Sequence, residues 1–193
     1  MFLKPIAAAL LAASLALPSF AFAANPHGDD LPPCPSRGEL PAECLVIIQN
    51  AGFDGDGALL NWMPDPLQPN KSRIEGDDNP QLALSPGGSV TQIVHLPGNI
   101  AAADASPYFL PSLFVRANDS SAKLAFSVSV VHAGGLYEAF SHEFSVGDTW
   151  MRPSGGFDVS QGTPTAFLIR IERKDDNAAA TAYVDDVQVI RQR

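Results

Sequence analysis

The histidines, serines and acidic residues of the chain do not form a known catalytic signature. The sequence contains no G-x-S-x-G elbow, no H-E-x-x-H zinc motif and no phosphate-binding P-loop. The four histidines do not fall at the spacing of metal ligands: His27, His95, His132 and His142. A glycosidase needs only two positioned carboxylates, which composition leaves open. These observations favour a protein that is not an enzyme.

Two acidic stretches lie at opposite ends of the chain. Asp54-Gly55-Asp56-Gly57 resembles the first half of an EF-hand loop, but the rest of that loop, including its closing Glu, is missing. Asp185-Asp186 lies inside the last apolar run. Oxygen ligands of this kind suit Ca²⁺, and the same acids could equally cap turns or face solvent.

Aromatic side chains are the second group with a chemical use. Sugar recognition needs aromatic faces that stack on pyranose C–H surfaces, together with polar groups for the hydroxyls. The candidates are Trp62, Tyr108, Tyr137 and Trp150. We expect Trp62 and Trp150 to pack in the core or at its rim, which leaves Tyr137 as the better ligand-facing candidate.

Alternation along residues 136–144 predicts the neighbours of Tyr137. It places Tyr137 on one side with Ala139, Ser141 and Glu143, opposite Phe140 and Phe144. Arg170 lies opposite an apolar face in a later run, as do Ser127, Ser129 and Glu172 in their own runs. If these strands share a sheet, Tyr137, Ser141, Glu143 and Arg170 form a shallow binding surface; a plain solvated face is the alternative.

Cys34 and Cys44 are the two cysteines of the chain. They stand ten positions apart in a Pro-rich segment, so in an oxidising compartment a disulfide is the simplest reading. Two reduced thiols are the alternative, and a metal pair lacks the further Cys or His ligands that zinc needs.

Residues 1–23 predict a secretory signal peptide. Lys4 precedes an apolar run broken by Pro18, and the segment closes on the cleavage pattern Ala21-Phe22-Ala23. The run is short for a membrane anchor, so we expect a secreted or periplasmic protein that begins near Ala24 and does not insert into a membrane. Cleavage would remove one of 12 Lys/Arg and none of 21 Asp/Glu, leaving 170 residues with a formal charge of −10. Such an acidic chain is a poor partner for nucleic acid.

The remaining sequence predicts an all-β domain. Residues 24–43 read as an irregular Pro-rich arm, and residues 44–193 as a single domain. Residues 50–80 read as a long loop or several short strand pieces. Short alternating runs bounded by Gly, Pro, Asn, Asp or Ser predict strands at residues 45–48, 81–84, 90–96, 112–116, 123–131, 136–144, 165–172 and 182–190. No window has a helical stripe, so a β-sandwich or barrel is expected.

Four motifs occur in the order found in one known family. They are VIIQNAGFD at 46–54 with Trp62 downstream, SVTQIVHLPG at 89–98, GDTWMRPSGGFDV at 147–159 and AYVDDVQVI at 182–190. This order resembles galactose-binding-like jelly rolls, in particular carbohydrate-binding modules of the CenC type. The resemblance spans residues 45–191. Asp54 stands where Glu is commoner, the Cys34/Cys44 arm is extra, and residues 97–111 have no matching signature, so loop-borne ligand contacts do not transfer.

The resemblance implies a two-sheet antiparallel jelly-roll sandwich whose first and last strands are neighbours. It also implies a structural Ca²⁺ site with Asp54 and Asp185 as ligands and the Gly52 carbonyl as a third. The implied function is a secreted, non-catalytic module that binds a polysaccharide or other glycan. The alternative is an extracellular or envelope domain that uses the same sandwich for structural or protein contacts, with a partner that the sequence does not identify.

Overall fold

A computed structural model describes residues 31–54, 59–102, 107–118, 121–159 and 162–193, with the side chains of 101 and 102 left out. The signal-peptide prediction and residues 55–57 of the acidic run therefore lie outside the described residues. Within these ranges no helix is long and apolar enough to cross a membrane.

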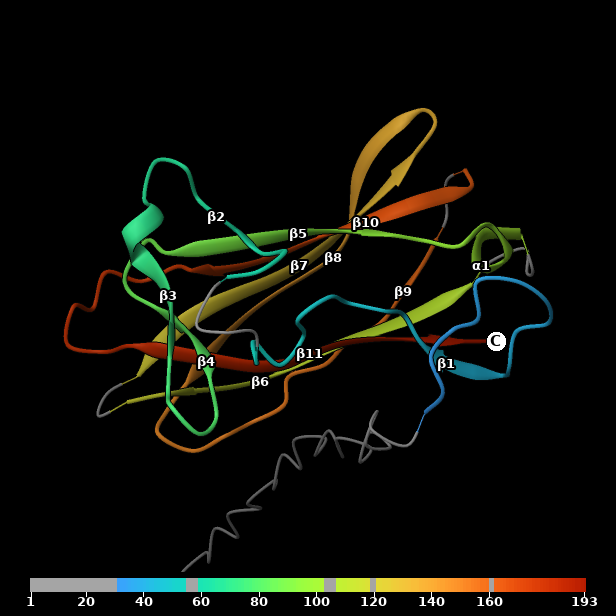
Figure 1. The fold of residues 1–193 in the computed structure, drawn as a ribbon. Coiled ribbons are helices and arrows are strands. Elements are labelled where there is room, and N and C mark those ends of the chain that lie inside the picture. The colour runs from blue at the N-terminus through green and yellow to red at the C-terminus, as the bar shows by residue number, and fades with distance from the viewer. Residues whose placement is uncertain (1–30, 55–58, 103–106, 119–120, 160–161) are drawn as a thin grey trace, which may run out of the picture.

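The chain forms two antiparallel sheets that pack as layers (Figure 1). Sheet A has the order β3 (Ser72–Glu75), β4 (Gln81–Leu84), β11 (Ala182–Gln192), β6 (Tyr108–Ala117) and β9 (Phe157–Asp158), and β1 (Glu43–Leu45) also pairs with β11. Sheet B has the order β2 (Met63–Pro64), β5 (Ser89–His95), β10 (Pro164–Arg173), β7 (Ala122–His132) and β8 (Gly135–Val146). This architecture confirms the predicted two-sheet jelly-roll sandwich.

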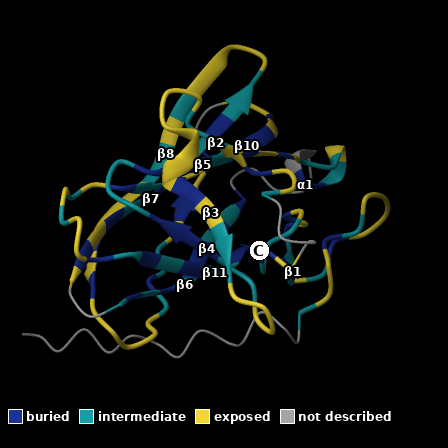
Figure 2. Cartoon of the chain, turned by 60° about the vertical axis from the view of Figure 1, so that its left-hand side comes forward, coloured by how far each residue is buried: buried dark blue, intermediate teal, exposed yellow. Residues whose placement is uncertain are grey.

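Alternation places the core between the layers. In β7 the buried residues are Ala122, Leu124, Phe126, Val128 and Val130, and in β10 they include Phe167, Ile169 and Ile171. Figure 2 shows buried residues along the paired strands and exposed ones in the loops and along β8. Phe109 joins the two layers, because its ring centre lies 4.8 Å from that of Phe167 on the opposite sheet.

Most predicted strands are present, with bounds that differ by a few residues, and β6 begins four residues earlier than the predicted 112–116. Two predictions were wrong in detail. The first strand is β1 at Glu43–Leu45 and ends before residues 46–48, although the Val46 N–H still donates to the Val189 carbonyl. Two short helical turns, η2 (Pro69–Lys71) and α1 (Gly98–Ala102), lie in loops and bury too few residues to leave a periodic stripe. Residues 50–80 contain the short strands β2 and β3, as the second alternative predicted.

The disulfide between Cys34 and Cys44 is formed, as predicted. Closing a loop of this length stabilises the fold by about 2.5–3 kcal/mol in the chain-entropy model. The closed loop is also hydrogen-bonded to the turn at α1, where Asn99 Nδ2 donates to the Pro35 carbonyl over 2.9 Å. The residues before β1 are thus attached to the sandwich covalently and by hydrogen bonds.

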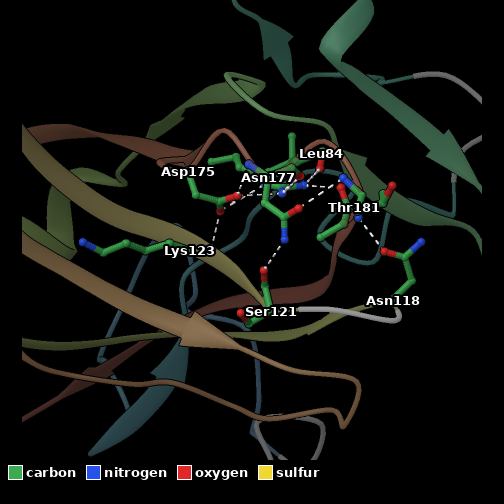
Figure 3. A network of polar contacts seen from close by, with 10 residues as sticks. Leu84, Asn118, Ser121, Lys123, Asp175, Asn177 and Thr181 are labelled. Carbon is green, nitrogen blue, oxygen red and sulfur yellow. Dashed lines mark hydrogen bonds and ion pairs between the residues drawn. The ribbon is translucent and has the colours of Figure 1, made fainter.

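A buried arginine connects the two sheets. Figure 3 shows the polar network to which it belongs, with Leu84, Asp175 and Asn177 among the labelled residues. Arg173 of β10 donates to the carbonyls of Leu84 on β4 (3.1 Å) and of Ala180 before β11 (2.7 Å). Its charge is balanced by Asp175, 2.8 Å away, which also accepts the backbone N–H groups of Lys123 and Asn177. Hydrogen bonds to a guanidinium and to two amides hold the pKa of Asp175 at about 2.

We expect this network to make stability depend on pH in the acid range. The folded-state pKa of Asp175 is depressed, so its contribution is complete above pH 4 and is lost as pH falls towards 2. Urea unfolding between pH 6 and 2 should show about 1–2 kcal/mol less stability for Asp175→Asn than for wild type at pH 6, and a vanishing difference near pH 2. Asp176→Asn, at an exposed neighbour, serves as the control and should match wild type. Equal stability of Asp175→Asn and wild type at pH 6 would contradict this role.

Candidate functional site

The outer face of sheet B carries a row of polar residues that crosses four strands. Strand register aligns Thr91 of β5 with Arg170 of β10, Arg170 with Ser127 of β7, and Ser127 with Ser141 of β8. Arg170 and Ser141 are exposed, and Thr91 and Ser127 are half-buried. Their side chains offer hydroxyl donors and acceptors and a guanidinium at roughly the 4.8 Å spacing of neighbouring strands.

Rows on either side complete this surface. One contains Ile93, Leu168, Ser129 and Glu138, and the other contains Glu172, Ala125 and Glu143. Charged pairs border the polar row: Arg170 lies 3.3 Å from Glu172, and Lys123 lies 2.9 Å from Glu143. The hydrogen bond and charge of Lys123 lower the pKa of Glu143, so Glu143 is ionised at neutral pH. The structure therefore brings Ser141, Glu143 and Arg170 together, as the sequence predicted.

Tyr137 does not join them, and the predicted face assignment was wrong. Val128 pairs with Phe140, whereas Ser129 pairs with Glu138, so Ala139 is an extra residue in a β-bulge of β8. The bulge reverses the alternation, and Tyr137 lies opposite buried Val130 on the core side. Its ring centre is 5.7 Å from that of His132, and its hydroxyl is buried without a hydrogen-bond partner among the described residues.

The tryptophans and the other tyrosines are also absent from the outer face of sheet B. Trp62 is a core residue, 2% exposed, and its indole N–H donates to the Asn50 carbonyl over 3.0 Å. Trp150 is 37% exposed and lies against Phe114 of sheet A. Tyr108 and Tyr183 belong to β6 and β11 of sheet A. The prediction of core or rim packing is confirmed for Trp62, whereas Trp150 lies outside the core on sheet A.

Because Tyr137 is a core-side residue, we expect its substitutions to change stability. Tyr137→Ala should lower the free energy of unfolding by about 2–3 kcal/mol, since it removes a ring that packs on the core. Tyr137→Phe keeps the ring and removes a buried hydroxyl without a partner, so it should be at least as stable as wild type. Denaturant unfolding of the two variants tests this. An unaltered Tyr137→Ala midpoint, or a clearly destabilised Tyr137→Phe, would contradict the placement.

A second candidate site lies where β11 is interrupted. Its ladder with β6 shifts between Asp185 and Gln188, and Asp186 adopts a left-handed conformation with φ 45°. The turn of residues 50–54 lies beside this bulge, since the Val187 N–H donates to the Ala51 carbonyl over 3.1 Å. Asn50 and Phe53 also have positive φ, which folds the turn tightly enough to bring Asp54 towards β11. Neighbouring strands from the two ends of the chain were predicted, and pairing of β1 with β11 confirms this.

The carboxylates of Asp54 and Asp185 converge beside Gly52. A Cβ atom placed on Gly52 would lie 2.7 Å from Asp54 Oδ2 and 3.7 Å from Asp185 Oδ1, so both oxygens face the space that glycine leaves open. Burial raises the pKa of Asp185, and the charges of Asp186 and Asp54 raise it further. Asn79 Nδ2 contacts Asp185 Oδ2 over 3.4 Å. A half-buried acid, Asp185, beside the exposed acid Asp54 is the electrostatic setting that a cation relieves.

This donor set fits Ca²⁺ better than a transition metal. All the nearby groups offer oxygen, and no group of three His, Cys, Asp or Glu side chains in the described part of the chain is placed to hold a metal. Two carboxylates therefore need neutral oxygens to complete a coordination shell, and Ca²⁺ accepts backbone carbonyls, amides and water. Asn79 is one neighbouring amide, although it presents Nδ2 to Asp185, and Gly52 is the residue whose open side both carboxylates face.

Comparisons with known proteins identify the fold. No family model matches the chain, and no curated protein matches it. Among solved structures, it is similar to TmCBM61 in complex with β-1,4-galactotriose (14% identity, TM-score 0.54, 74% of this chain and 95% of that one). It is equally similar to the CBM22-1 xylan-binding domain of Paenibacillus barcinonensis Xyn10C (14% identity, TM-score 0.54, 80% and 99%). A CBM4 structure matches with 16% identity and a TM-score of 0.53, over 76% of this chain and all of that one. The fold is thus that of jelly-roll carbohydrate-binding modules, among them CBM4, the CenC type, as the motifs indicated.

Proposed function

We propose that the chain is a secreted, non-catalytic module that binds a glycan through the outer face of sheet B. The observation that carries this proposal is the polar row of Thr91, Arg170, Ser127 and Ser141 across four adjacent strands. A chain of sugar rings is long and flat and presents hydroxyls at regular intervals, which suits such a row. The likeness of the fold to modules described as bound to galactotriose or as xylan-binding supports the ligand class.

Arg170 is the strongest hydrogen-bonding group of this surface. Its guanidinium contacts Glu172 over 3.3 Å through Nε and is about half exposed, so its other nitrogens can reach a ligand. Ser127 and Ser141 lie beside it in register and add hydroxyls. Without a tryptophan or tyrosine to stack on, binding depends on these polar contacts, and we expect weak affinity, in the range of 10⁻⁴ to 10⁻³ M, roughly 4–5.5 kcal/mol.

A glycan array on residues 24–193, followed by titration calorimetry with the best oligosaccharide, tests the proposal. Arg170→Gln should weaken binding about tenfold, because hydrogen bonds from a charged group contribute about 1.5 kcal/mol. Ser141→Ala should weaken it about threefold. Lys71→Gln, which removes an exposed charge on η2, is the matched control and should bind as wild type.

Two outcomes would count against this function. Wild-type affinity in both Arg170→Gln and Ser141→Ala would move the site away from this face. Absence of binding to any glycan at millimolar concentration would instead favour the structural or protein-contact role of the same sandwich.

We also propose that Ca²⁺ binds between Asp54 and Asp185, with the Gly52 carbonyl and Asn79 nearby. The ion would link the turn of residues 50–54 to β11 and would stabilise the fold without contacting the outer face of sheet B. The convergence of two carboxylates on the open side of Gly52 supports this role.

Calcium should therefore raise the thermal midpoint of wild type, with about 2.7 kcal/mol of stabilisation at free Ca²⁺ 100-fold above Kd. Asp185→Asn should remove the response, and Asp176→Asn should retain it. In EDTA the raised pKa of Asp185 predicts that its contribution to stability falls as pH rises through that pKa, because the repelling charge then forms. Equal midpoints in Ca²⁺ and EDTA for wild type would exclude the site.

A further inference from the structure

The outer face of sheet A carries an arginine held between two aromatic rings. The guanidinium carbon of Arg116, on β6, lies 4.7 Å from the ring centre of Tyr183 on β11. It lies 5.1 Å from the ring centre of Trp150, in the segment between β8 and β9. Contacts of this kind between a cation and ring faces fix the side chain and leave its N–H groups unused.

Arg116 differs in this respect from its neighbours. Arg152 pairs with Asp186 over 2.9 Å, and Arg73 pairs with Glu75. Arg116 has no carboxylate within ion-pair distance and no hydrogen bond among the described residues, and its Nε is enclosed without a partner. Its two terminal nitrogens are not enclosed, so they are open to a ligand. Only the enclosed Nε carries a desolvation cost, and the terminal nitrogens have no acceptor among the described residues to give up when an anion binds.

The surroundings of Arg116 are fixed before any ligand arrives. Trp150 packs edge-on against Phe114, with ring centres 6.5 Å apart. The next residue of the segment, Met151, exchanges two backbone hydrogen bonds of 2.9 Å with Val115. Arg152 then lies 4.5 Å over the Phe114 ring. Because the segment is attached to β6 on both sides of Trp150, little conformational entropy remains to be lost on binding.

We propose that Arg116 and Trp150 form a site for a carboxylate-bearing sugar residue, a uronate, on the sheet opposite the proposed glycan surface. The planar fork of a guanidinium matches a carboxylate with two parallel hydrogen bonds. Trp150, 37% exposed beside it, gives the pyranose ring an apolar surface. The acidity of the whole chain acts over only about 8 Å at physiological salt. Close to the site, Asp186 is paired with Arg152 and Glu75 with Arg73, so among the described residues there Arg116 supplies the unpaired charge. The proposal does not depend on the outer face of sheet B.

Trigalacturonate is the probe. Its fully methyl-esterified form is the control, because it has the same sugar rings but no carboxylate charge. Trp150 reports the event, because the other tryptophan of the chain, Trp62, is only 2% exposed. Titration with trigalacturonate should change the tryptophan emission and protect it from iodide quenching. The methyl ester should bind at least tenfold more weakly, because it cannot accept both charge-assisted hydrogen bonds.

Variants assign the effect to Arg116. Arg116→Gln should weaken trigalacturonate binding at least tenfold, and Arg116→Lys about fivefold, since lysine keeps the charge but loses the fork. Arg37→Gln removes the same charge from the exposed loop before β1 and should bind as wild type. Arg170→Gln should also bind trigalacturonate as wild type, which separates this site from the proposed glycan surface.

The proposal is overturned if wild type does not respond to 10 mM trigalacturonate, about the weakest affinity such a contact could give. It is also overturned if the methyl ester binds equally well, or if Arg116→Lys retains full affinity. The first two measurements use wild type alone, so they decide the question even if Arg116→Gln does not fold. Loss of trigalacturonate binding in Arg170→Gln with full binding in Arg116→Lys would assign the ligand to sheet B instead.

Discussion

The hydrogen-bond ladders on both edges of β11 hold sheet A together. One edge pairs with β6 over most of its length, and the other pairs with β4 near Ala182 and with β1 near Gln192. Between β4 and β1, the Val187 N–H donates to the Ala51 carbonyl in the turn of residues 50–54, and the Val189 carbonyl accepts from the Val46 N–H. The bulge at Asp185–Gln188 makes this possible, since it turns Asp186 towards Arg152 and keeps Val187 in the core. The bulge in β11 thus positions both the carboxylate pair of Asp54 and Asp185 and the arginine, Arg152, that lies over the Phe114 ring.

Alternation in the sequence was sufficient to predict β5, β7 and β10, because each is a regular strand with one buried face. It failed in β8, where the extra residue Ala139 leaves no mark in composition and places Tyr137 on the opposite side of the strand from Ser141. It also could not find Arg116 as part of a site, since Tyr183 and Trp150 reach it from segments far apart in the chain. The sequence did contain a weak indication of this site. Phe114 and Arg116 alternate with buried Val115, and Trp150 and Arg152 stand in a segment where apolar residues do not recur at a regular spacing. The disulfide was predictable because its two cysteines are close in sequence and have no competing partners.

The two outer faces differ in chemistry because they differ in what covers them. The outer face of sheet B exposes short hydroxyl side chains and paired charges, together with Ile93 and Glu138. The outer face of sheet A is lined along β6 by the segment of residues 147–156, which brings Trp150 and Arg152 onto Phe114 and Arg116. On sheet A, the rings on either side of Arg116 hold its guanidinium in one orientation. On sheet B, the hydroxyl groups and the Arg170 guanidinium are solvated and can reorient. A single sandwich therefore carries one surface suited to many weak contacts and one suited to a single charged group.

The position of β11 in the chain also determines when sheet A can form. β11 follows β1, β4 and β6 in sequence, so each of these strands lacks one neighbour in sheet A until residues 182–192 have been synthesised. Glu43 must then pair with Gln192, and Arg173 must donate to the Leu84 carbonyl, although the members of each pair are far apart in the sequence. Contacts so distant in sequence are slow to form and leave strand edges open meanwhile. The hairpin of β7 and β8 and the Cys34–Cys44 disulfide join residues that are close in sequence, so they can form before β11 is available. Assembly of sheet A therefore waits for β11, and loss of this strand would leave the carboxylates of Asp54 and Asp185 and the ring contacts of Arg116 without a common support.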